Sequence, residues 1–327
     1  MESEPADIYR VARWCRLNEE TFRKQYKFHL SGFPEWDQLD HCGDWLLFPQ
    51  NLSPCLGIDE TALSSGELYT VVTNKAAKGG KGAPVALIKG TKSSAVSEAL
   101  MKIPLKERVK VTEVTLDMAD AMDWIVRESF PNAEKVTDRF HAQQLVSEAL
   151  QDMRIRERRK AIDEENKAIR KTKELGQAYR PMAYRNGDTK KQLPARSRHL
   201  LYKPQSRWSE SQKERAAILF KEFRDLEHDY SLSMMFRSAY EHSKTRDEAK
   251  IKLEEWHRKV EEKNFSSFVT ASESIRSHEG TILNYFPGRS TNASAESFNS
   301  KLKGFRALVR GVTDLKFFLF RIAKIYG

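Results

Sequence analysis

Residues 109–142 constrain the fold most, because two apolar runs in them each end at an acidic residue. The run 111–116 has the spacing of a half-buried strand and stops at Asp117. Apolar residues at helical spacing follow, and a second short run then ends at Asp138. We therefore predict a strand–helix–strand unit. Ligand sites of such units lie at the carboxyl ends of the strands, where both aspartates stand.

The segment before this unit has the pattern of a β-hairpin and one further strand. Residues 55–60 and 67–73 are predicted to pair through a turn at 64–66, and 84–88 to form a third strand. A helix over 91–101, opened by a Thr/Ser cap, is expected to follow. Three antiparallel strands followed by helix, strand, helix and strand predict an α/β fold with a mixed sheet.

The N-terminal residues 8–30 are predicted to form two short helices with a break near Leu17, the second capped by Asn18. Two interpretations fit this pattern equally. One is a degenerate helix-turn-helix whose second helix presents Arg23, Lys24 and Lys27 to DNA. The other is an amphipathic helical hairpin that packs on the main domain.

Composition favours a polyanionic partner. The 56 Lys and Arg against 46 Asp and Glu give a formal charge of +10, with a pI near 9.3. Three scattered cysteines are too few for a disulfide framework, and no paired His/Cys spacing indicates zinc. No apolar run reaches the roughly 20 residues of a membrane span. We expect a soluble intracellular protein in a reducing cytosol.

The later chain is helical and charged. The cluster of arginines and a lysine at 154–160 is dense enough to bind phosphates, although most mixed-charge runs of this kind are solvated helix faces. A helix is predicted to begin near Asn292. On it Glu296, Asn299 and Lys303 recur at the three- and four-residue steps that share one face. An apolar helix over 314–326 is expected to pack on the sheet.

Three acidic residues from separate elements have the chemistry of a magnesium site. They are Asp59 at the end of the first strand, Asp117 at the end of the fourth and Glu296 on the late helix. Mg²⁺ prefers a few carboxylates together with water and substrate phosphate. Phosphodiester chemistry uses two such ions. The three acids form a site for them if the sheet brings the first and fourth strands side by side.

Three strings resemble the insertion-sequence transposases of the DDE class, specifically the ISL-three-type family. They are GIDETALSSGELYTVVTNK, VTLDMADAMDWIVRESFPNAEKVTDRFHAQQLVSEAL and YFPGRSTNASAESFNSKLKGFR. The likeness covers roughly residues 56–150 and 281–326. It implies an RNase H-like core, a large all-helical insertion before the last catalytic helix, and Mg²⁺ or Mn²⁺ as cofactor.

The resemblance also implies roles for single residues. The catalytic and metal-binding triad would be Asp59, Asp117 and Glu296, with Asp117, Asp138 and Glu296 as the alternative set. Asp138 and His141 match the DxxH signature and are placed beside the site, His141 as a structural brace. The DNA-contacting positions would be Arg289, Asn292, Asn299, Lys301 and Lys303.

Four regions are expected: an N-terminal helical region at 1–50, which is a possible helix-turn-helix remnant; the first part of the core at 51–141; the helical insertion at 142–280; and the final core helices at 281–327. Relatives usually carry an N-terminal zinc-binding and DNA-binding region, and this chain has only the doubtful helix-turn-helix. We therefore expect end recognition to depend on a separate polypeptide or to be lost.

The expected function is metal-dependent cleavage at transposon ends followed by strand transfer into target DNA. The expected partners are double-stranded DNA and further copies of the chain in a synaptic complex, without a membrane. The expected location is the bacterial cytoplasm, associated with the nucleoid. Two alternatives are a DNA-binding relic without activity and a structure-selective nuclease that cuts branched DNA and joins nothing.

Overall fold

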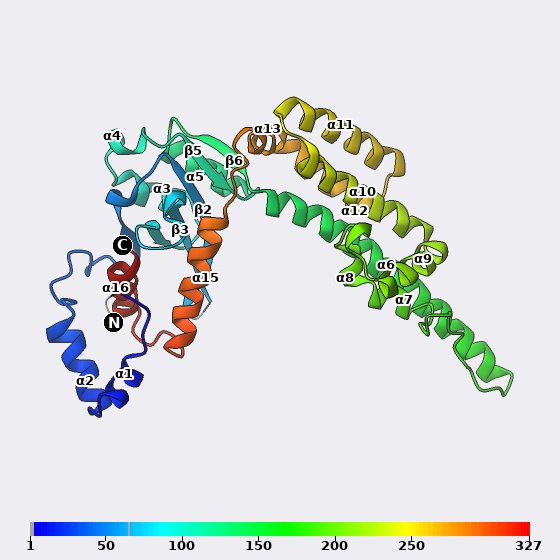
Figure 1. Cartoon of the computed structure of the whole chain (residues 1–327), viewed down its shortest axis with the longest axis horizontal. Helices are drawn as coiled ribbons and strands as arrows, with labels where there is room; N and C mark the ends of the chain where they lie inside the picture. The colour runs from blue at the N-terminus through cyan, green and yellow to red at the C-terminus, as the bar shows by residue number, and fades with distance from the viewer. Residues whose placement is uncertain (1–2, 65) are drawn as a thin grey trace. The chain divides into compact units, whose positions relative to one another are not determined.

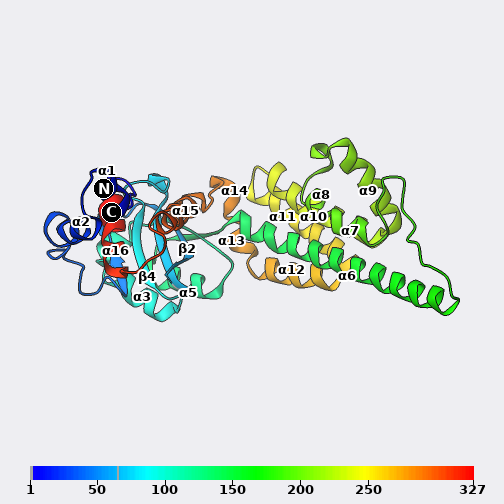
Figure 2. The same cartoon turned by 90° about the horizontal axis from the view of Figure 1, so that it is seen from below.

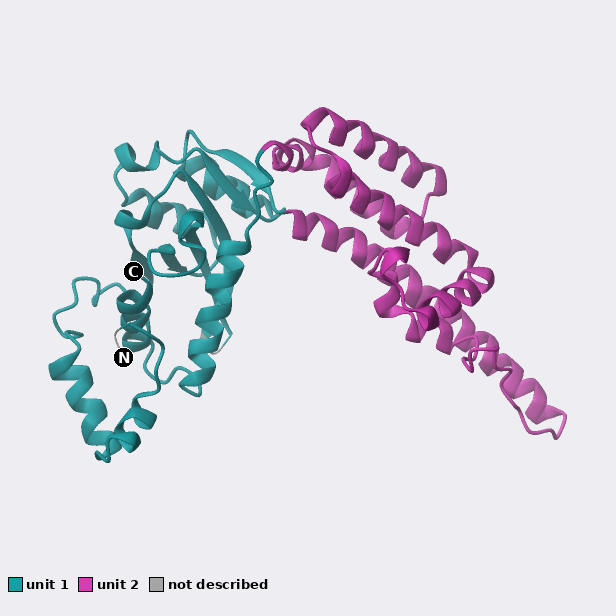
Figure 3. Ribbon diagram, in the orientation of Figure 1, with its two compact units in different colours: residues 1–138, 288–327 teal, residues 139–287 magenta. Residues whose placement is uncertain are grey.

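The computed structural model describes residues 3–64 and 66–327. It divides into two compact units (Figure 3): unit 1 comprises Met1–Asp138 with Gly288–Gly327, and unit 2 comprises Arg139–Pro287. The chain therefore leaves unit 1 after its last strand and returns to it just before its final two helices. The turn expected at 64–66 includes Ser65, which lies outside the described residues.

Unit 1 is built on a six-stranded mixed sheet with the order β1-β4-β3-β2-β5-β6. The strands are β1 (Trp45–Leu47), β2 (Cys55–Ser64), β3 (Glu67–Asn74), β4 (Pro84–Lys89), β5 (Glu113–Leu116) and β6 (Glu134–Thr137). β3 pairs antiparallel with both β2 and β4. On the other side of β2, β5 pairs parallel with β2, and β6 pairs parallel with β5. The predicted mixed sheet is confirmed, and its topology is consistent with the RNase H-like fold of transposases.

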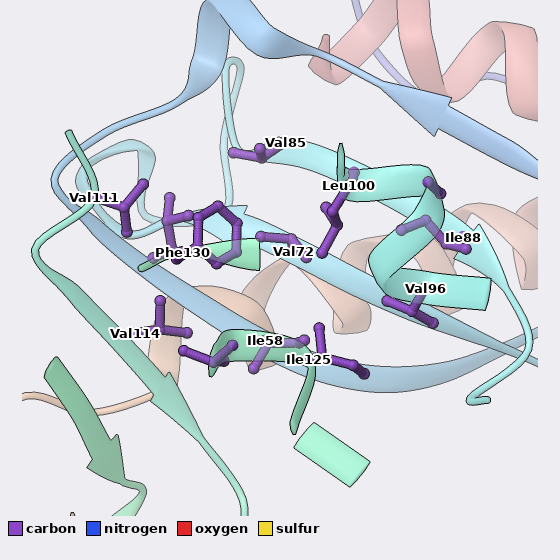
Figure 4. Packing of buried hydrophobic residues seen from close by; sticks show 14 of the residues in the cluster. Ile58, Val72, Val85, Ile88, Val96, Leu100, Val111, Val114, Ile125 and Phe130 are labelled. Atoms are coloured by element: carbon purple, nitrogen blue, oxygen red, sulfur yellow. The ribbon is translucent and has the colours of Figure 1, made fainter. Parts of the chain in front are cut away.

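One face of the sheet is covered by α3 (Ser93–Met101) and α5 (Asp120–Ser129), with the short α4 (Leu105–Arg108) between them. Figure 4 shows how apolar side chains from the strands and from these helices fill this layer. Ile58 and Val114 meet Ile125 there, and all three are at most 1% exposed. Side chains alternate along a strand, so the residues next to Ile58 face the other side of the sheet.

The opposite face carries α15 (Ala293–Leu308) and α16 (Leu315–Tyr326), as Figure 1 shows in orange and red. Phe298 and Leu302 of α15 and Phe318 of α16 are buried in one cluster with Val71 and Leu87 of the sheet. The predicted final helix therefore packs on the sheet as expected.

The N-terminal segment forms α1 (Ile8–Trp14), α2 (Glu19–Gln25) and a π-helical turn, η1 (Tyr26–Leu30). The side chain of Asn18 caps α2 by accepting from the Thr21 amide at 2.9 Å, as predicted. Tyr26 packs with Phe317 and Phe320 of α16. Both Arg23 and Lys27, expected to face phosphates in the helix-turn-helix interpretation, form ion pairs within the protein, with Glu20 and Asp314 respectively.

Unit 2 is entirely helical apart from an isolated bridge between Ala183 and Thr189. Its helices are α6 (Arg139–Glu174), α7 (Gln192–Arg196), α8 (Arg198–Leu201), the 3₁₀ turn η4 (Gln205–Arg207), α9 (Glu210–Glu222), α10 (Arg224–His242), α11 (Arg246–Lys263), α12 (Ser266–Ser277), α13 (Glu279–Leu283) and α14 (Tyr285–Gly288), the last of which ends in unit 1. α6 packs against α10 and α12. Within the described ranges, no helix is long and apolar enough to cross a membrane.

Three local details differ from the sequence prediction. β2 runs on to Ser64, so Asp59 lies inside this strand and not at its end. β1 was not expected, because three residues at a sheet edge carry no recognisable alternation. The N-cap of α3 is Lys92, without a side-chain hydrogen bond, so the expected Thr/Ser cap at this helix is wrong.

Candidate active site

Asp59 and Asp117 occupy equivalent places on neighbouring parallel strands. The last residue pair between β2 and β5 is Gly57 with Thr115, and each aspartate lies two residues beyond it. Residues in register on adjacent strands point to the same face. Gly57 lies against Asn292, which precedes α15, so Asp59 and Asp117 belong to the face that α15 covers. Both carboxylates are half-buried.

Asp138 follows β6, the strand next to β5, so Asp59, Asp117 and Asp138 form a row of aspartates across three neighbouring strands. β5 and β6 end their pairing at Leu116 with Thr137, so Asp138 is in register with Asp117. The Asp138 amide donates to the Leu116 carbonyl at 2.8 Å, and the residue is only 1% exposed. Asp59 and Asp138, the two candidates for the third acid of the triad, therefore lie on either side of Asp117.

Glu296 lies in the first turn of α15 and is exposed. The helix that carries it is attached to β2 by two side-chain hydrogen bonds. Asn299 Nδ2 donates to Asp59 Oδ2 at 2.8 Å, and Asn292 Nδ2 donates to the Ile58 carbonyl at 2.9 Å. Both amides are buried, with exposures of 4% and 2%.

Gly57 permits this close approach. A Cβ atom at position 57 would lie 2.2 Å from Oδ1 of Asn292 and 3.2 Å from Oγ1 of Thr73. Any larger residue would push Asn292 away from β2. The start of α15 therefore depends on a glycine that precedes Asp59 by two residues.

A half-buried ion-pair network holds the segment that leads into α15. Lys75, which follows β3, donates to Glu113 at 3.0 Å and to Thr115 at 2.8 Å, both on β5. Ser290 bonds to both Lys75 and Glu113. The three segments are separated in the chain, so this network fixes where the chain re-enters unit 1 just ahead of Glu296.

Glu60 adds a further carboxylate next to the row. Burial raises the pKa of Glu60, and the negative charges of Asp117 and Asp59 raise it further. Carboxylate oxygens are the ligands that Mg²⁺ and Mn²⁺ prefer, and a cation would relieve this mutual repulsion. These side chains therefore have the chemistry that a divalent metal prefers. As they stand, no three His, Cys, Asp or Glu side chains of residues 3–64 and 66–327 are close enough to hold one.

The positions expected to contact DNA divide into two kinds. Lys301 and Lys303 are exposed on α15, and Lys301 also donates to the Gly79 carbonyl at 2.7 Å. Arg289 is exposed with a left-handed φ of 52°. By contrast, Asn292 and Asn299 are buried and bond to β2, which differs from the expectation that they contact DNA.

Arg289 lines a shallow hollow of about 360 Å³ at the start of α15. Lys75 and Lys78 line it from the segment after β3, and hydroxyl groups from the 290–294 segment complete its wall. This basic surface lies in the same unit as the aspartate row.

His141 lies in the first turn of α6, which belongs to unit 2, and it is half-buried. Asp138 is the last residue of unit 1.

Sequence reasoning missed Glu60, Lys75 and Gly57 as parts of this site. Glu60 directly follows Asp59 in the sequence, and this adjacency could have indicated it. The roles of Lys75 and Gly57 arise from contacts with residues more than 200 positions away, for which one sequence carries no signal.

A family model described as a transposase, of the ISL-three-type DDE group, matches residues 56–322. No curated protein and no solved structure matches the chain significantly. The matched region begins at β2, includes the whole of unit 2 and ends within α16. The chain therefore belongs to the ISL-three-type family of DDE transposases.

Proposed function

We propose that this chain cleaves DNA at transposon ends and transfers the freed 3′-OH into target DNA, with Asp59, Asp117 and Glu296 as the catalytic triad. One observation carries the proposal: Asp59 and Asp117 each lie two residues beyond the last pair of β2 and β5, and the helix with Glu296 is bonded directly to Asp59 through Asn299. A transposase must act on DNA, and the family match supports that setting.

The triad would hold Mg²⁺ or Mn²⁺ through its carboxylate oxygens. When bound, such ions supply charge stabilisation at the phosphorus and activate the attacking oxygen. Cleavage by water and attack by a 3′-OH are both in-line displacements at phosphorus, so one set of residues serves both steps. We assign Asp138 a supporting role beside Asp117, and His141 the role of a structural brace.

Asn299 and Asn292 act as positioning residues in this proposal. Each is buried and donates to β2, so each fixes α15 relative to Asp59. DNA contact is proposed for the exposed basic residues around the same helix, which are Arg289, Lys301 and Lys303. Their positive charge neutralises phosphates, which makes binding strongly salt-dependent.

The assembly follows from the reaction. Two transposon ends must be held together, so we propose that at least two copies act in a synaptic complex with double-stranded DNA. We further propose that a separate polypeptide supplies end recognition, and that the protein works in the bacterial cytoplasm on the nucleoid. In the proposed domain organisation, the helical region 1–50 precedes a core formed by 51–141 and 281–327. Residues 142–280 are an insertion in this core.

The direct test is Glu296→Gln in an excision and integration assay on a plasmid that carries the native element. The variant is expected to lose cleavage by about 10³-fold, since metal-based charge stabilisation is worth several kcal/mol, and to keep its DNA affinity. Glu98→Gln, an exposed glutamate on α3, is the matched control and should cleave normally.

Three results would contradict the proposal. Cleavage by Glu296→Gln at the wild-type rate would exclude the triad. Metal-independent DNA binding with no cleavage by the wild type would identify a relic. Cutting of branched DNA without any joining would identify a nuclease.

A further inference from the structure

The longest helix, α6, continues well beyond the core of its own unit. Its last buried residue is Ala161, yet the helix runs on to Glu174. Thirteen residues at 1.5 Å each extend about 20 Å past that core. Figure 2 shows this green end of α6 passing beyond the neighbouring helices of unit 2, after which the chain turns back.

The base of this extension is firmly held. On the returning chain, Lys190 forms an ion pair with Glu164 of α6 at 2.7 Å. Nearby, the fully buried carboxylate of Asp188 accepts from Arg215 at 2.8 Å and also binds Arg196. Burial alone would raise the pKa of Asp188, but hydrogen bonds from these two arginines lower it overall. Residues beyond this base are therefore presented from a fixed support.

We call residues 166–182, which lie beyond this base, the distal arm. It contains one acidic residue and five exposed basic residues: Lys167, Arg170, Lys171, Lys173 and Arg180. In the part of the chain that the structure describes, none of these five forms an ion pair with a carboxylate. Closer to the core, by contrast, α6 pairs Arg156 with Asp152 and Lys160 with Glu157.

The spacing of the basic residues makes them repel one another. Lys167 and Lys171 are four residues apart, and Arg170 lies three residues from both Lys167 and Lys173. Like charges at these steps face each other on a helix and destabilise it. A polyanion bound along the arm would replace this repulsion by attraction. The cluster is therefore better suited to a bound anionic partner than to free solvent.

Only part of the basic cluster that the sequence indicated on α6 is both exposed and unpaired among the described residues. In the cluster 154–160, Arg154 is buried and donates to Gln151 and to the Pro194 carbonyl. Arg156 and Lys160 are already paired with acids. Arg158 and Arg159 are exposed and, among the described residues, form no ion pair. Exposed basic residues of this kind continue about two to four turns beyond Lys160, in the distal arm.

We propose that the distal arm binds the phosphate backbone of duplex DNA without reading its sequence. The inference rests on the proposed function, because that function supplies DNA as the polyanion. Duplex DNA carries one negative charge per about 1.7 Å of axis, so the helical part of the arm, residues 166–174 with a length of about 12 Å, meets several phosphates at once. The arm thereby gives unit 2 a DNA-binding surface separate from the basic residues around α15.

The test is the salt dependence of duplex binding by the full chain, measured by fluorescence anisotropy with a chelator present so that no cleavage occurs. The arm variant replaces four basic residues by glutamine: Lys167, Arg170, Lys171 and Lys173. The control variant makes the same change of net charge at four exposed positions that are paired with acids: Lys213, Lys250, Arg258 and Lys259. Glutamine keeps the helix propensity high, so both variants should fold.

The arm variant is expected to flatten the plot of log K against log salt by about 0.9 for each phosphate that the arm no longer neutralises, or about 3 for three phosphates, on every duplex sequence tested. The control variant should keep the wild-type slope. Equal slopes for the two variants would overturn the proposal while leaving the proposed function intact. A lower oligomeric mass with an unchanged slope would overturn it as well and assign the arm to association between copies. Failure of the wild type to bind DNA at all would overturn both proposals.

Discussion

The Nδ2 atom of Asn299 donates a 2.8 Å hydrogen bond to Oδ2 of Asp59, so the helix that carries Glu296 is tied directly to the strand that carries Asp59. The bond joins residues 240 positions apart and is almost completely buried on the asparagine side. It sets the distance between two members of the proposed triad. Its loss should therefore change function more than stability.

We predict that Asn299→Ala lowers the free energy of unfolding by about 1–3 kcal/mol, the range for a hydrogen bond to a charged group. It should also weaken Mn²⁺ binding, because Asp59 loses the donor that orients it. Urea denaturation and calorimetry measure the two effects. Ser300→Ala, at an exposed position of the same helix, is the control. Loss of stability with unchanged Mn²⁺ affinity would reduce Asn299 to a packing residue.

Gly57→Ala should destabilise unit 1 by about 1–3 kcal/mol, the usual cost of overpacking, because the new methyl group would collide with Asn292. It should also reduce cleavage by displacing the start of α15. The informative comparison is the double variant Gly57→Ala with Asn292→Ala. Since both changes act on one pair of residues, the double variant should lose clearly less stability than the sum of the two single losses. Gly43→Ala, where a methyl group meets nothing within 4 Å, is the control, and simple additivity would refute this explanation.

Asp229 in unit 2 gives a prediction about pH. Burial raises the pKa of its carboxyl to about 8, and the negative charges of Asp225 and Glu157 add to the effect. Neither carboxylate oxygen has a hydrogen-bond partner among the described residues. The folded state therefore holds a proton that the unfolded state releases near pH 4. The stability that this group contributes is complete below pH 4 and is lost as the pH rises through 8.

Asp229→Asn removes the ionisation and keeps the shape. We expect it to raise the free energy of unfolding by about 3 kcal/mol at pH 9 and by clearly less at pH 7, since ionising a buried unpaired carboxylate is costly. Urea denaturation at both pH values measures this difference. Burial lowers the pKa of His257 to about 4, so His257 stays neutral between pH 7 and pH 9 and does not change the measured difference. The exposed Asp247→Asn is the control, and an equal effect at pH 7 and 9 would contradict the assignment.

Patterns that repeat along one element were readable from the sequence. The alternation in β2 and β5 and the helical spacing from Asn292 onward placed Asp59, Asp117 and Glu296 on elements that the structure also contains. A mixed sheet followed from the connectivity, whereas the pairing of β2 with β5 was only a condition of the predicted metal site. These features depend only on periodicity and on simple rules for linking strands.

Features that depend on a distant partner were not readable. The sequence put Asn299 on the same helix face as Glu296 but gave no sign that its amide would bond to Asp59 rather than to DNA. Gly57 looks like any strand glycine until Asn292 is placed against it. In the 154–160 cluster, burial of Arg154 depends on a carbonyl 40 residues further along the chain. Charge density alone therefore did not separate the basic residues of this cluster that are buried or paired from Arg158 and Arg159, which are exposed.

The most direct measurement is calorimetric binding of Mn²⁺ to the wild type and to four single variants, each with a short DNA duplex present. The variants are Asp59→Asn, Asp117→Asn, Asp138→Asn and Glu296→Gln. The proposed triad predicts that binding is lost at Asp59, Asp117 and Glu296 and retained at Asp138. Loss of binding in Asp138→Asn in place of Asp59→Asn would favour the alternative set of Asp117, Asp138 and Glu296. Absence of Mn²⁺ binding by the wild type would contradict the proposed enzymatic function.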